Sequence, residues 1–229
     1  MAAYNYKRFS TSNYDYGSFS GPTPGEEMLD FTLRSLDGEE AKLTDFKGQW
    51  LVLETGSLTC PMYVKNINPI KRVVQKYPDV QFLVIYIREA HPGTRRGPHQ
   101  TMGEKISVAR EMQQEYGEAR RVLVDDLDGS MHQAYGSFPN MVYVINPKGE
   151  VVYRCDWAYS HLIDKVLRDR PKLNFVERKR IITAVPWIMV PVTLKGGWDA
   201  LWDILIALPA ILWGHLKVDI SSIFRKQSS

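Results

Sequence analysis

The 229-residue sequence contains only two cysteines, and it lacks both a dense Lys/Arg tract and an apolar leader. Two thiols are too few for a disulfide scaffold or a four-cysteine zinc site. A net charge of +3 speaks against nucleic acid as the main partner. The first ten residues, MAAYNYKRFS, hold no apolar h-region, so we expect a cytoplasmic protein in a reducing compartment.

The composition is that of a folded protein, with 44% hydrophobic and 24% charged residues. Residues 1–25 are the exception, because they are rich in Tyr, Ser, Asn and Gly and show no strand or helix period. We predict that they form a flexible tail. The alternative is a segment whose tyrosines lie over the body of the protein.

Strand and helix patterns alternate across residues 26–170. Apolar runs typical of buried strands occupy 49–56, 81–87 and 121–125, and helical spacing of apolar residues separates them. A hairpin over 141–154 and a final helix complete the pattern. This order predicts an α/β domain with a mixed, partly parallel sheet flanked by helices.

Residues 171–229 form an apolar extension rich in tryptophan. Its most apolar part, DALWDILIALPAILWGHL, contains Asp199, Asp203 and Pro209. It is shorter than the ~20 apolar residues that a membrane-spanning helix needs. We predict a helical extension and leave three uses open for residues 187–216: packing on their own domain, a homodimer face, or peripheral contact with a membrane.

The main chemical signal is the run Gly-Ser-Leu-Thr-Cys-Pro at residues 56–61. Cys60 stands between a buried strand and a helix start, where backbone amides and the helix macrodipole favour a thiolate. We therefore expect its pKa to lie below the ordinary value of ~8.5. Pro61 suits the first helical position, and Ser57 and Thr59 can hydrogen-bond the sulfur or a bound atom. The alternative for Cys60 is a buried structural cysteine.

The second thiol belongs to Cys155, at the end of the last predicted strand. It could resolve an oxidised Cys60, or it could be an inert core residue. Tyr63 occupies the position of a second thiol in a Cys-x-x-Cys motif, which speaks against a simple dithiol oxidoreductase.

A pair of polar residues, Glu89 and His91, follows the strand predicted at 81–87. The carboxyl ends of strands are where α/β sheets place their sites, and residues two apart on an extended chain face the same side. The alternatives are a surface ion pair for Glu89 and an ordinary loop histidine for His91. Arg95 and Arg96 follow and could hold an anionic substrate or remain solvated.

Other polar residues carry weaker signals. His99 shares a loop with His91, but a third ligand is lacking, so we expect no metal site. The acidic residues in 125–128 lack the rest of a calcium-loop pattern and predict a turn. His132 is expected to be a partly exposed helix residue.

The motifs resemble those of the iodothyronine deiodinases. The family's Gly-Ser-x-Thr-selenocysteine-Pro run resembles residues 56–61, with Cys60 in place of selenocysteine, and its Tyr-Ile-x-Glu-Ala-His block resembles residues 86–91. Weaker likenesses are Pro139, before a Tyr-containing strand, and the Trp-x-Tyr that begins at Trp157. The frame up to the cysteine also resembles peroxiredoxins and other thioredoxin-fold proteins, so the resemblance implies a thioredoxin-like (peroxiredoxin-like) fold.

The resemblance implies a thiol-dependent oxidoreductase acting on a small, halogenated aromatic substrate. Cys60 would be the nucleophile, and Glu89 and His91 would form the proton relay. Pro139 would be the cis-proline that faces the thiol. An external thiol such as thioredoxin or glutathione would reduce the oxidised sulfur, and no bound cofactor is implied. Trp157 is a candidate substrate contact, like the two loop arginines.

Two other functions remain open. One is a peroxiredoxin-like thiol peroxidase, since Ser57 stands three residues before the cysteine, where such peroxidases keep Thr or Ser. Leu53 replaces the proline that they keep seven residues before it, which counts against this reading. The other is a redox-inactive, membrane-associated or interaction protein that uses the Trp-rich extension.

Overall fold

The computed structural model describes residues 4–14, 19–170, 175–176 and 185–226, with side chains described as far as Trp213. One sheet contains the strands β1 (Thr32–Ser35), β2 (Glu40–Lys42), β3 (Trp50–Gly56), β4 (Val80–Tyr86), β5 (Arg121–Val124), β6 (Val142–Ile145), β7 (Val151–Cys155) and β8 (Phe175–Val176). The helices are α1 (Pro61–Lys76), α2 (Met102–Tyr116), α3 (Ser130–Ala134), α4 (Ser160–Arg168), α5 (Pro186–Thr193) and α6 (Trp198–Lys226), with 3-10 turns η1 (Thr11–Asn13) and η2 (Leu43–Phe46).

The strand order is β2-β1-β5-β4-β3-β6-β7-β8. Strands β3, β4 and β5 are parallel, while β6 pairs with β3 and β7 in antiparallel fashion. The central strands are buried on both faces, which explains why they appear in the sequence as nearly continuous apolar runs. The predicted partly parallel α/β sheet is confirmed.

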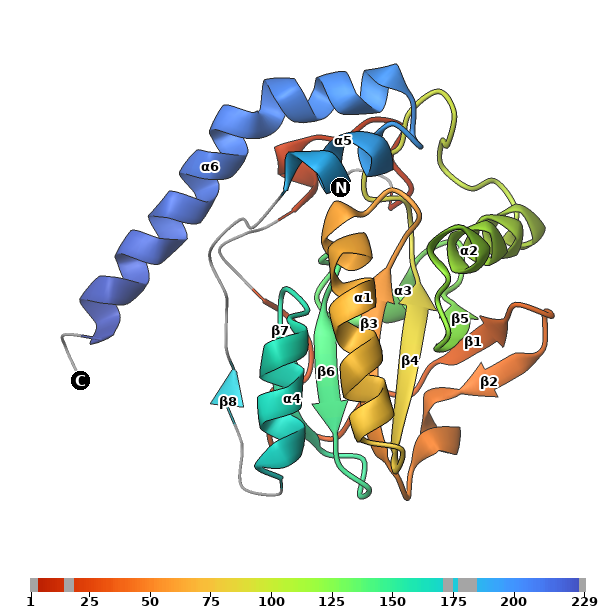
Figure 1. Cartoon of the computed structure of the whole chain (residues 1–229), viewed down its shortest axis with the longest axis vertical. Helices are drawn as coiled ribbons and strands as arrows, with labels where there is room; N and C mark the ends of the chain where they lie inside the picture. Colours follow the sequence, from red (N-terminus) through yellow and green to blue (C-terminus); the bar gives the residue numbers. More distant parts are fainter. Residues whose placement is uncertain (1–3, 15–18, 171–174, 177–184, 227–229) are drawn as a thin grey trace.

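Helices cover both faces of the sheet. Helices α1, α2 and α4 lie on one face, and α3 with the early part of the chain lies on the other (Figure 1). Side chains alternate along β3, so Val52 packs towards α1 and α4 while Leu51 and Leu53 join the opposite core.

The register of β3 and β4 brings two predicted loops together. Gly56 at the end of β3 pairs with Tyr86 at the end of β4. Cys60 follows the first strand and Glu89 follows the second, so both leave the sheet at the same edge. This is the edge at which parallel α/β sheets form their sites.

The described N-terminal residues pack against this edge, in contrast to the predicted flexible tail. Phe9 and Phe19 are each only 8% exposed. Tyr4 and Tyr6 place their rings 4.6 and 4.5 Å from the Arg88 guanidinium. We call residues 4–14 the N-terminal cap. Its anchor is a buried cation among aromatic rings, which explains how a segment without a regular period is held in place.

Helices α5 and α6 lie beyond the sheet, above the carboxyl ends of its central strands (Figure 1). Ala200 and Ile204 on α6 are buried. The turn before α6 fits closely against the loop that follows β4: a Cβ on Gly93 would lie 2.6 Å from the Gly196 carbonyl oxygen, and a Cβ on Gly196 would lie 2.3 Å from the His91 carbonyl oxygen. Across the described residues, we find no helix with the length and apolar character needed to cross a membrane.

Candidate active site

Cys60 lies at the N-cap of α1, where the sequence places it. Its backbone is extended, and Pro61 occupies the first turn of the helix. The Cys60 carbonyl accepts the Val64 N–H at 3.1 Å, so the residue begins the helix hydrogen-bond pattern. The side chain is only 1% exposed, which means that the thiol is closed off from water in this conformation.

Burial, together with smaller contributions from the carboxylates of Glu89 and Glu54, raises the pKa of the Cys60 thiol to about 12. The backbone N–H groups of Tyr63 and Met62 act in the opposite direction, as expected for a helix start. The predicted low pKa is therefore wrong for the closed conformation, because desolvation of the thiolate outweighs the helix amides. A thiolate needs the site to open or a base to take the proton.

Glu89 is held against the residue beside the thiol. Its carboxylate accepts the Thr59 N–H at 2.8 Å and the Thr59 hydroxyl at 2.5 Å, and it also accepts a hydrogen bond from the Tyr86 hydroxyl. The Thr59 hydroxyl in turn accepts the His91 N–H at 3.0 Å. Glu89 is 3% exposed, so it is a buried member of the site and not a surface ion pair.

Ser57 makes a second connection between the same two loops. Its hydroxyl is fully buried and accepts the Ala90 N–H at 3.2 Å. Together with Thr59, it fixes the loop after β4 against the loop that carries Cys60. The two hydroxyls predicted to serve the sulfur therefore also position the acidic and histidine residues.

The His91 imidazole is neutral in this site, because burial lowers its pKa to about 3, with Asp203 acting weakly the other way. Its Nδ1 atom is buried and has no hydrogen-bond partner among the described residues. The ring packs 4.7 Å from the ring of Phe9 in the N-terminal cap. His91 thus has one ring nitrogen still available to a substrate or to water.

The loop that contains Pro139 is fixed to the end of β3. The Thr55 hydroxyl accepts the Met141 N–H at 2.7 Å, and the Asn140 amide donates to the Thr55 carbonyl at 2.9 Å. Pro139 is buried in this loop. Trp157 forms a backbone bridge with Asn140, so the structure brings it to the same edge.

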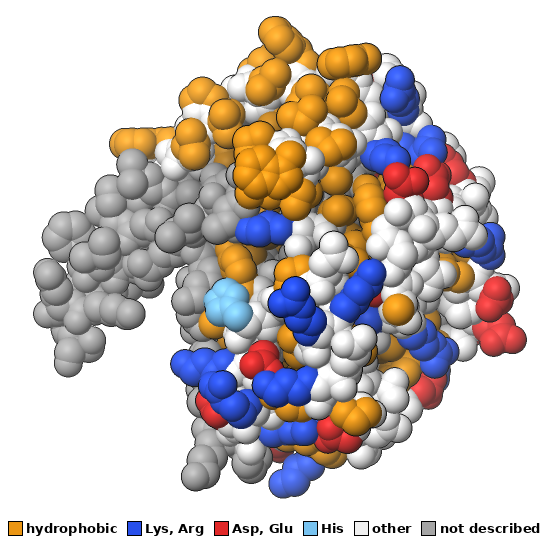
Figure 2. Space-filling view, in the orientation of Figure 1, with side chains coloured by type: hydrophobic (Ala, Val, Ile, Leu, Met, Phe, Trp, Pro, Cys, Tyr) orange, Lys and Arg blue, Asp and Glu red, His pale blue; other side chains and the backbone are white. Residues whose placement is uncertain are grey.

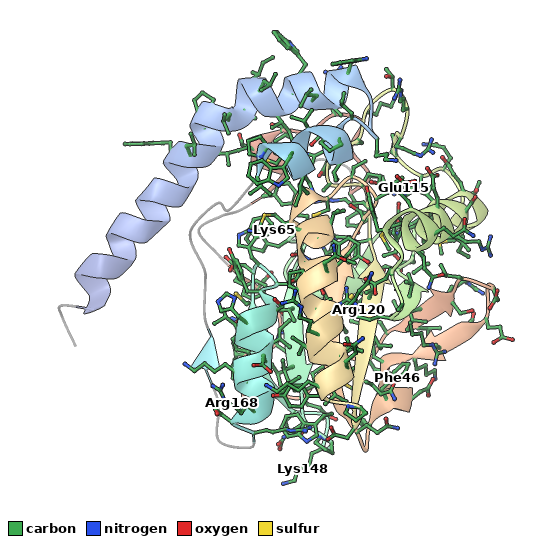
Figure 3. The ribbon with its side chains drawn as sticks, viewed as in Figure 1. Phe46, Lys65, Glu115, Arg120, Lys148 and Arg168 are labelled. Atoms are coloured by element: carbon green, nitrogen blue, oxygen red, sulfur yellow. The ribbon has the colours of Figure 1, made fainter. Side chains whose placement is uncertain are left out.

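A buried polar network supports the site and was not predicted. Arg120, labelled in Figure 3, forms ion pairs with Glu54 and Glu118. The Asn66 and Asn140 amides each donate to the Glu54 carboxylate at 2.9 Å. Glu54 therefore joins β3, α1 and the proline loop. A lone carboxylate inside the run QWLVLETG is the sequence signal that points to such a buried partner.

A second group missed by the sequence lies behind Glu89. The Tyr86 hydroxyl is 3.0 Å from His99 Nε2, and burial lowers the His99 pKa. Lys105 is fully buried, and its pKa is lowered to about 8, mainly by burial. Tyr86 and His99 extend the hydrogen-bond chain from Glu89, while the Lys105 ammonium donates to the Asp126 carbonyl at 2.6 Å. No short-range pattern links them, since they come from a strand end, a loop and a helix.

The remaining predicted residues are less central. Arg96 forms a bidentate ion pair with Glu111 at 2.6 and 2.7 Å, and the Arg95 N–H binds the Gly196 carbonyl. Cys155 is a buried thiol on β7, outside any disulfide, and it belongs to a different core cluster from Cys60. Its resolving role stays a prediction.

His132 departs from its predicted partly exposed position. It is completely buried, with Nδ1 2.8 Å from the Tyr4 hydroxyl and Nε2 2.8 Å from the Phe138 carbonyl oxygen. The ring therefore connects the N-terminal cap to the proline loop. Helix α3 is short, and its burial comes from the cap that covers it, which the helix sequence does not reveal.

The N-terminal cap closes the site. Tyr14 packs over Phe138 with ring centroids 6.5 Å apart and an interplanar angle of 18°, and the Tyr6 hydroxyl donates to the Ala90 carbonyl at 3.1 Å. Burial raises the pKa of Tyr14, and a charge on Cys60 acts in the same direction. Aromatic rings of the cap thus cover the histidine and the proline loop.

The fold and the single cysteine at the helix start define a thioredoxin-like protein. A solved structure with a TM-score of 0.50, assigned as a protein disulfide isomerase of Bacteroides thetaiotaomicron, covers 69% of this chain and 95% of its own at 15% identity. This likeness supports the fold alone.

The sequence profile described as Iodothyronine deiodinase matches residues 6–165, and the chain belongs to that family. It is 37% identical over 147 residues to the thyroxine 5-deiodinase of Ovis aries, covering 58% of this chain and 48% of the relative. The Homo sapiens thyroxine 5-deiodinase is also 37% identical over 147 residues, covering 58% of this chain and 46% of the relative. The chain thus matches these relatives over about half of their length.

Proposed function

We propose that this chain is a thiol-dependent oxidoreductase that removes a halogen from a small aromatic substrate. The observation that carries the proposal is the buried carboxylate of Glu89, hydrogen-bonded to Thr59 directly beside Cys60. A nucleophile, an acid–base group and a neutral histidine meet at one edge of the sheet. Membership of the deiodinase family supports this chemistry.

The proposed reaction has two stages. The Cys60 thiolate attacks the halogen, the carbon–halogen bond breaks with its electron pair left on carbon, and the carbon takes a proton. The sulfur is then a sulfenyl halide. One external thiol displaces halide to give a mixed disulfide, and a second thiol releases Cys60 and forms the oxidised dithiol. Overall, the aryl halide and two thiols give the arene, hydrogen halide and one disulfide.

The side chains provide a route for the proton. Glu89 accepts a hydrogen bond from the hydroxyl of Thr59, the residue before Cys60. We therefore assign its carboxylate the role of taking the Cys60 proton and returning it to carbon. Tyr86 and His99 continue the chain of hydrogen bonds on the far side of Glu89. Neutral His91, with an available ring nitrogen, is placed to bind the substrate or share the proton transfer.

The closed cap supports an aromatic substrate. Phe9 packs against His91, and Tyr14 stacks on Phe138 near the thiol. When the cap moves aside, these positions offer faces on which a substrate ring stacks in place of the cap rings. Trp157, whose ring centroid lies 6.2 Å from that of Phe138, would extend the aromatic surface.

The test is halide release from iodinated and brominated phenols with excess dithiothreitol. We expect the full chain to release halide and Cys60→Ser to release none. Cys155→Ser is the matched control, and we expect it to retain turnover because an external thiol reduces the enzyme. Absence of halide release from every phenol, with Cys60 shown to be reduced, would contradict dehalogenation.

The rate at which hydrogen peroxide oxidises Cys60 distinguishes a thiol peroxidase from the proposed dehalogenating enzyme. A peroxidase thiol needs an activated thiolate, whereas burial raises the Cys60 pKa to about 12 in the closed site. Stopped-flow Trp fluorescence, with Cys60→Ser as the blank, measures this rate. We expect a rate no faster than that of a free thiol. A much faster rate would favour the peroxidase instead.

A further inference from the structure

We propose that the outward face of α5 and α6 docks on a lipid bilayer surface. This interaction surface lies outside the redox site and does not depend on the proposed chemistry. Figure 2 shows hydrophobic side chains gathered over the two helices at the top of the molecule. We call this surface the Trp face, and its exposed members include Trp187, Trp198, Trp202, Leu205 and Ile206.

Helix α6 exposes its apolar face to solvent, whereas an ordinary surface helix buries that face. Trp198, Trp202, Leu205 and Ile206 follow the i, i+4, i+7, i+8 spacing of one helix face, and they are 71, 61, 52 and 65% exposed. The apolar residues of a water-exposed helix normally face the core. Here a continuous apolar stripe faces outward, and patches of this kind mark interaction sites.

The charges of α6 face the opposite way. The Asp199 carboxylate accepts the Thr94 N–H and the Thr94 hydroxyl, each at 3.0 Å. The Asp203 carboxylate binds the Arg8 guanidinium through two contacts of 2.6 Å. Both carboxylates therefore turn towards the domain and are already engaged. The outward stripe carries no charge that would need to be desolvated at an apolar interface.

Lys195, in the turn between the helices, is also engaged, because its ammonium pairs with Glu115 at 2.5 Å. Basic residues flank the two helices in sequence, with Arg178, Lys179 and Arg180 before them and Arg225 and Lys226 near the end of the chain. Basic residues that flank an apolar segment in sequence suit an anionic membrane surface.

The exposed tryptophans favour a lipid bilayer as the partner of the Trp face. Trp187 on α5 is 76% exposed, and four of the six tryptophans of the chain, including Trp213, lie on the two helices. Tryptophan is favoured at the boundary between acyl chains and headgroups, where one ring edge is apolar and the indole N–H meets water. A helix with its apolar side chains on the outward face and its carboxylates turned towards the domain would lie in the plane of the interface.

The experiment is co-sedimentation of the full chain with sucrose-loaded vesicles. One set contains phosphatidylcholine alone and the other contains equal parts of phosphatidylcholine and phosphatidylglycerol. We expect sedimentation with the anionic vesicles and a shift of Trp emission to shorter wavelength. The double variant Trp198→Ser/Trp202→Ser should partition at least about tenfold more weakly, because two aromatic side chains no longer enter the interface.

Leu29→Ser is the matched control, because Leu29 is 42% exposed and lies far from these helices in sequence. It should bind vesicles like the unaltered chain. Far-ultraviolet circular dichroism checks that each variant is folded, and Leu205→Glu provides a second disruption of the Trp face if the double variant does not fold.

Two results would overturn the proposal. One is that the folded full chain remains in the supernatant with both vesicle sets. The other is that light scattering without lipid shows a dimer, that Trp198→Ser/Trp202→Ser converts it to a monomer, and that vesicles capture neither. That second result would assign the Trp face to another copy of this chain.

Discussion

The Arg8 guanidinium donates a hydrogen bond to each carboxylate oxygen of Asp203 at 2.6 Å, although the two residues are 195 positions apart in the sequence. This contact ties the N-terminal cap to the first turns of α6. The cap closes the thiol site, and α6 carries the Trp face. The N-terminal cap and the beginning of α6 therefore meet over the same edge of the sheet.

The first prediction concerns closure of the cap. Arg8→Ala removes the Asp203 contact, and we expect Cys60 to react several-fold faster with iodoacetamide because the cap opens more often. The measurement uses a Cys155→Ser background, so that only one thiol reports. Arg34→Ala, which removes an exposed pair with Glu40, is the control and should leave the rate unchanged. If Cys60 were alkylated at the same rate in the Cys155→Ser parent, in Arg8→Ala and in Arg34→Ala, the Arg8–Asp203 contact would not hold the cap closed.

The second prediction separates catalysis from structure at Glu89. Glu89→Gln keeps the shape of the side chain but removes the charge that raises the Cys60 pKa. We expect halide release to fall about 10²- to 10⁴-fold, since the proton-transfer group is lost. The same variant should show a lower Cys60 pKa in the pH profile of alkylation. A fall in both turnover and alkylation at every pH would point to a merely damaged fold.

The third prediction is a pH dependence of stability at His91. Its pKa in the folded protein is lowered to about 3, below the unfolded value of ~6.5. The unfolded state therefore binds more protons below pH ~6.5, and stability is lost as the pH falls from there towards 3. Urea unfolding measures the free energy of unfolding at each pH. We expect this free energy to fall less steeply in His91→Gln, by about 1 kcal/mol per pH unit in this window. If the unfolding free energies of the two proteins showed the same pH dependence, the lowered pKa of His91 would be contradicted.

The fourth prediction concerns the buried ion network. Arg120→Met leaves the Glu54 and Glu118 carboxylates buried without their cation, and we expect a loss of about 3–5 kcal/mol in unfolding free energy. Urea denaturation measures it. Arg34→Met is the exposed counterpart and should change stability by less than about 1 kcal/mol. A similar small effect for both arginines would mean that the buried pair contributes no more than a surface pair.

The sheet and the thiol position could be predicted because their signals are local. Strands β3 and β4 are apolar runs, as strands buried on both faces must be, and Thr-Cys-Pro at a strand end marks a helix start. Glu89 and His91 could be placed at the same edge because parallel strands end together. The resemblance in residues 56–61 and 86–91 then pointed to the family.

The remainder depends on contacts between distant residues. Arg88 meets the Tyr4 carbonyl 84 positions away, and nothing in a Ser- and Tyr-rich segment without a period predicts that contact. The thiol pKa could not be predicted for the same reason: a helix start can be recognised from sequence, but the burial of the Cys60 side chain cannot. Strands β2 and β8 are too short to show a period.

The close fit between the loop after β4 and the turn before α6 provides a way to recognise this architecture elsewhere. A methyl group on Gly93 or Gly196 would collide with backbone oxygens, so both positions must lack a side chain wherever these segments meet in this way. A glycine two residues after the Glu-Ala-His block, together with a Gly-Gly-Trp at the start of a C-terminal helix, is thus a diagnostic pair. Chains that carry both glycines can be expected to pack helices equivalent to α5 and α6 against the loop after β4. Chains that lack these glycines can be expected to leave that loop uncovered.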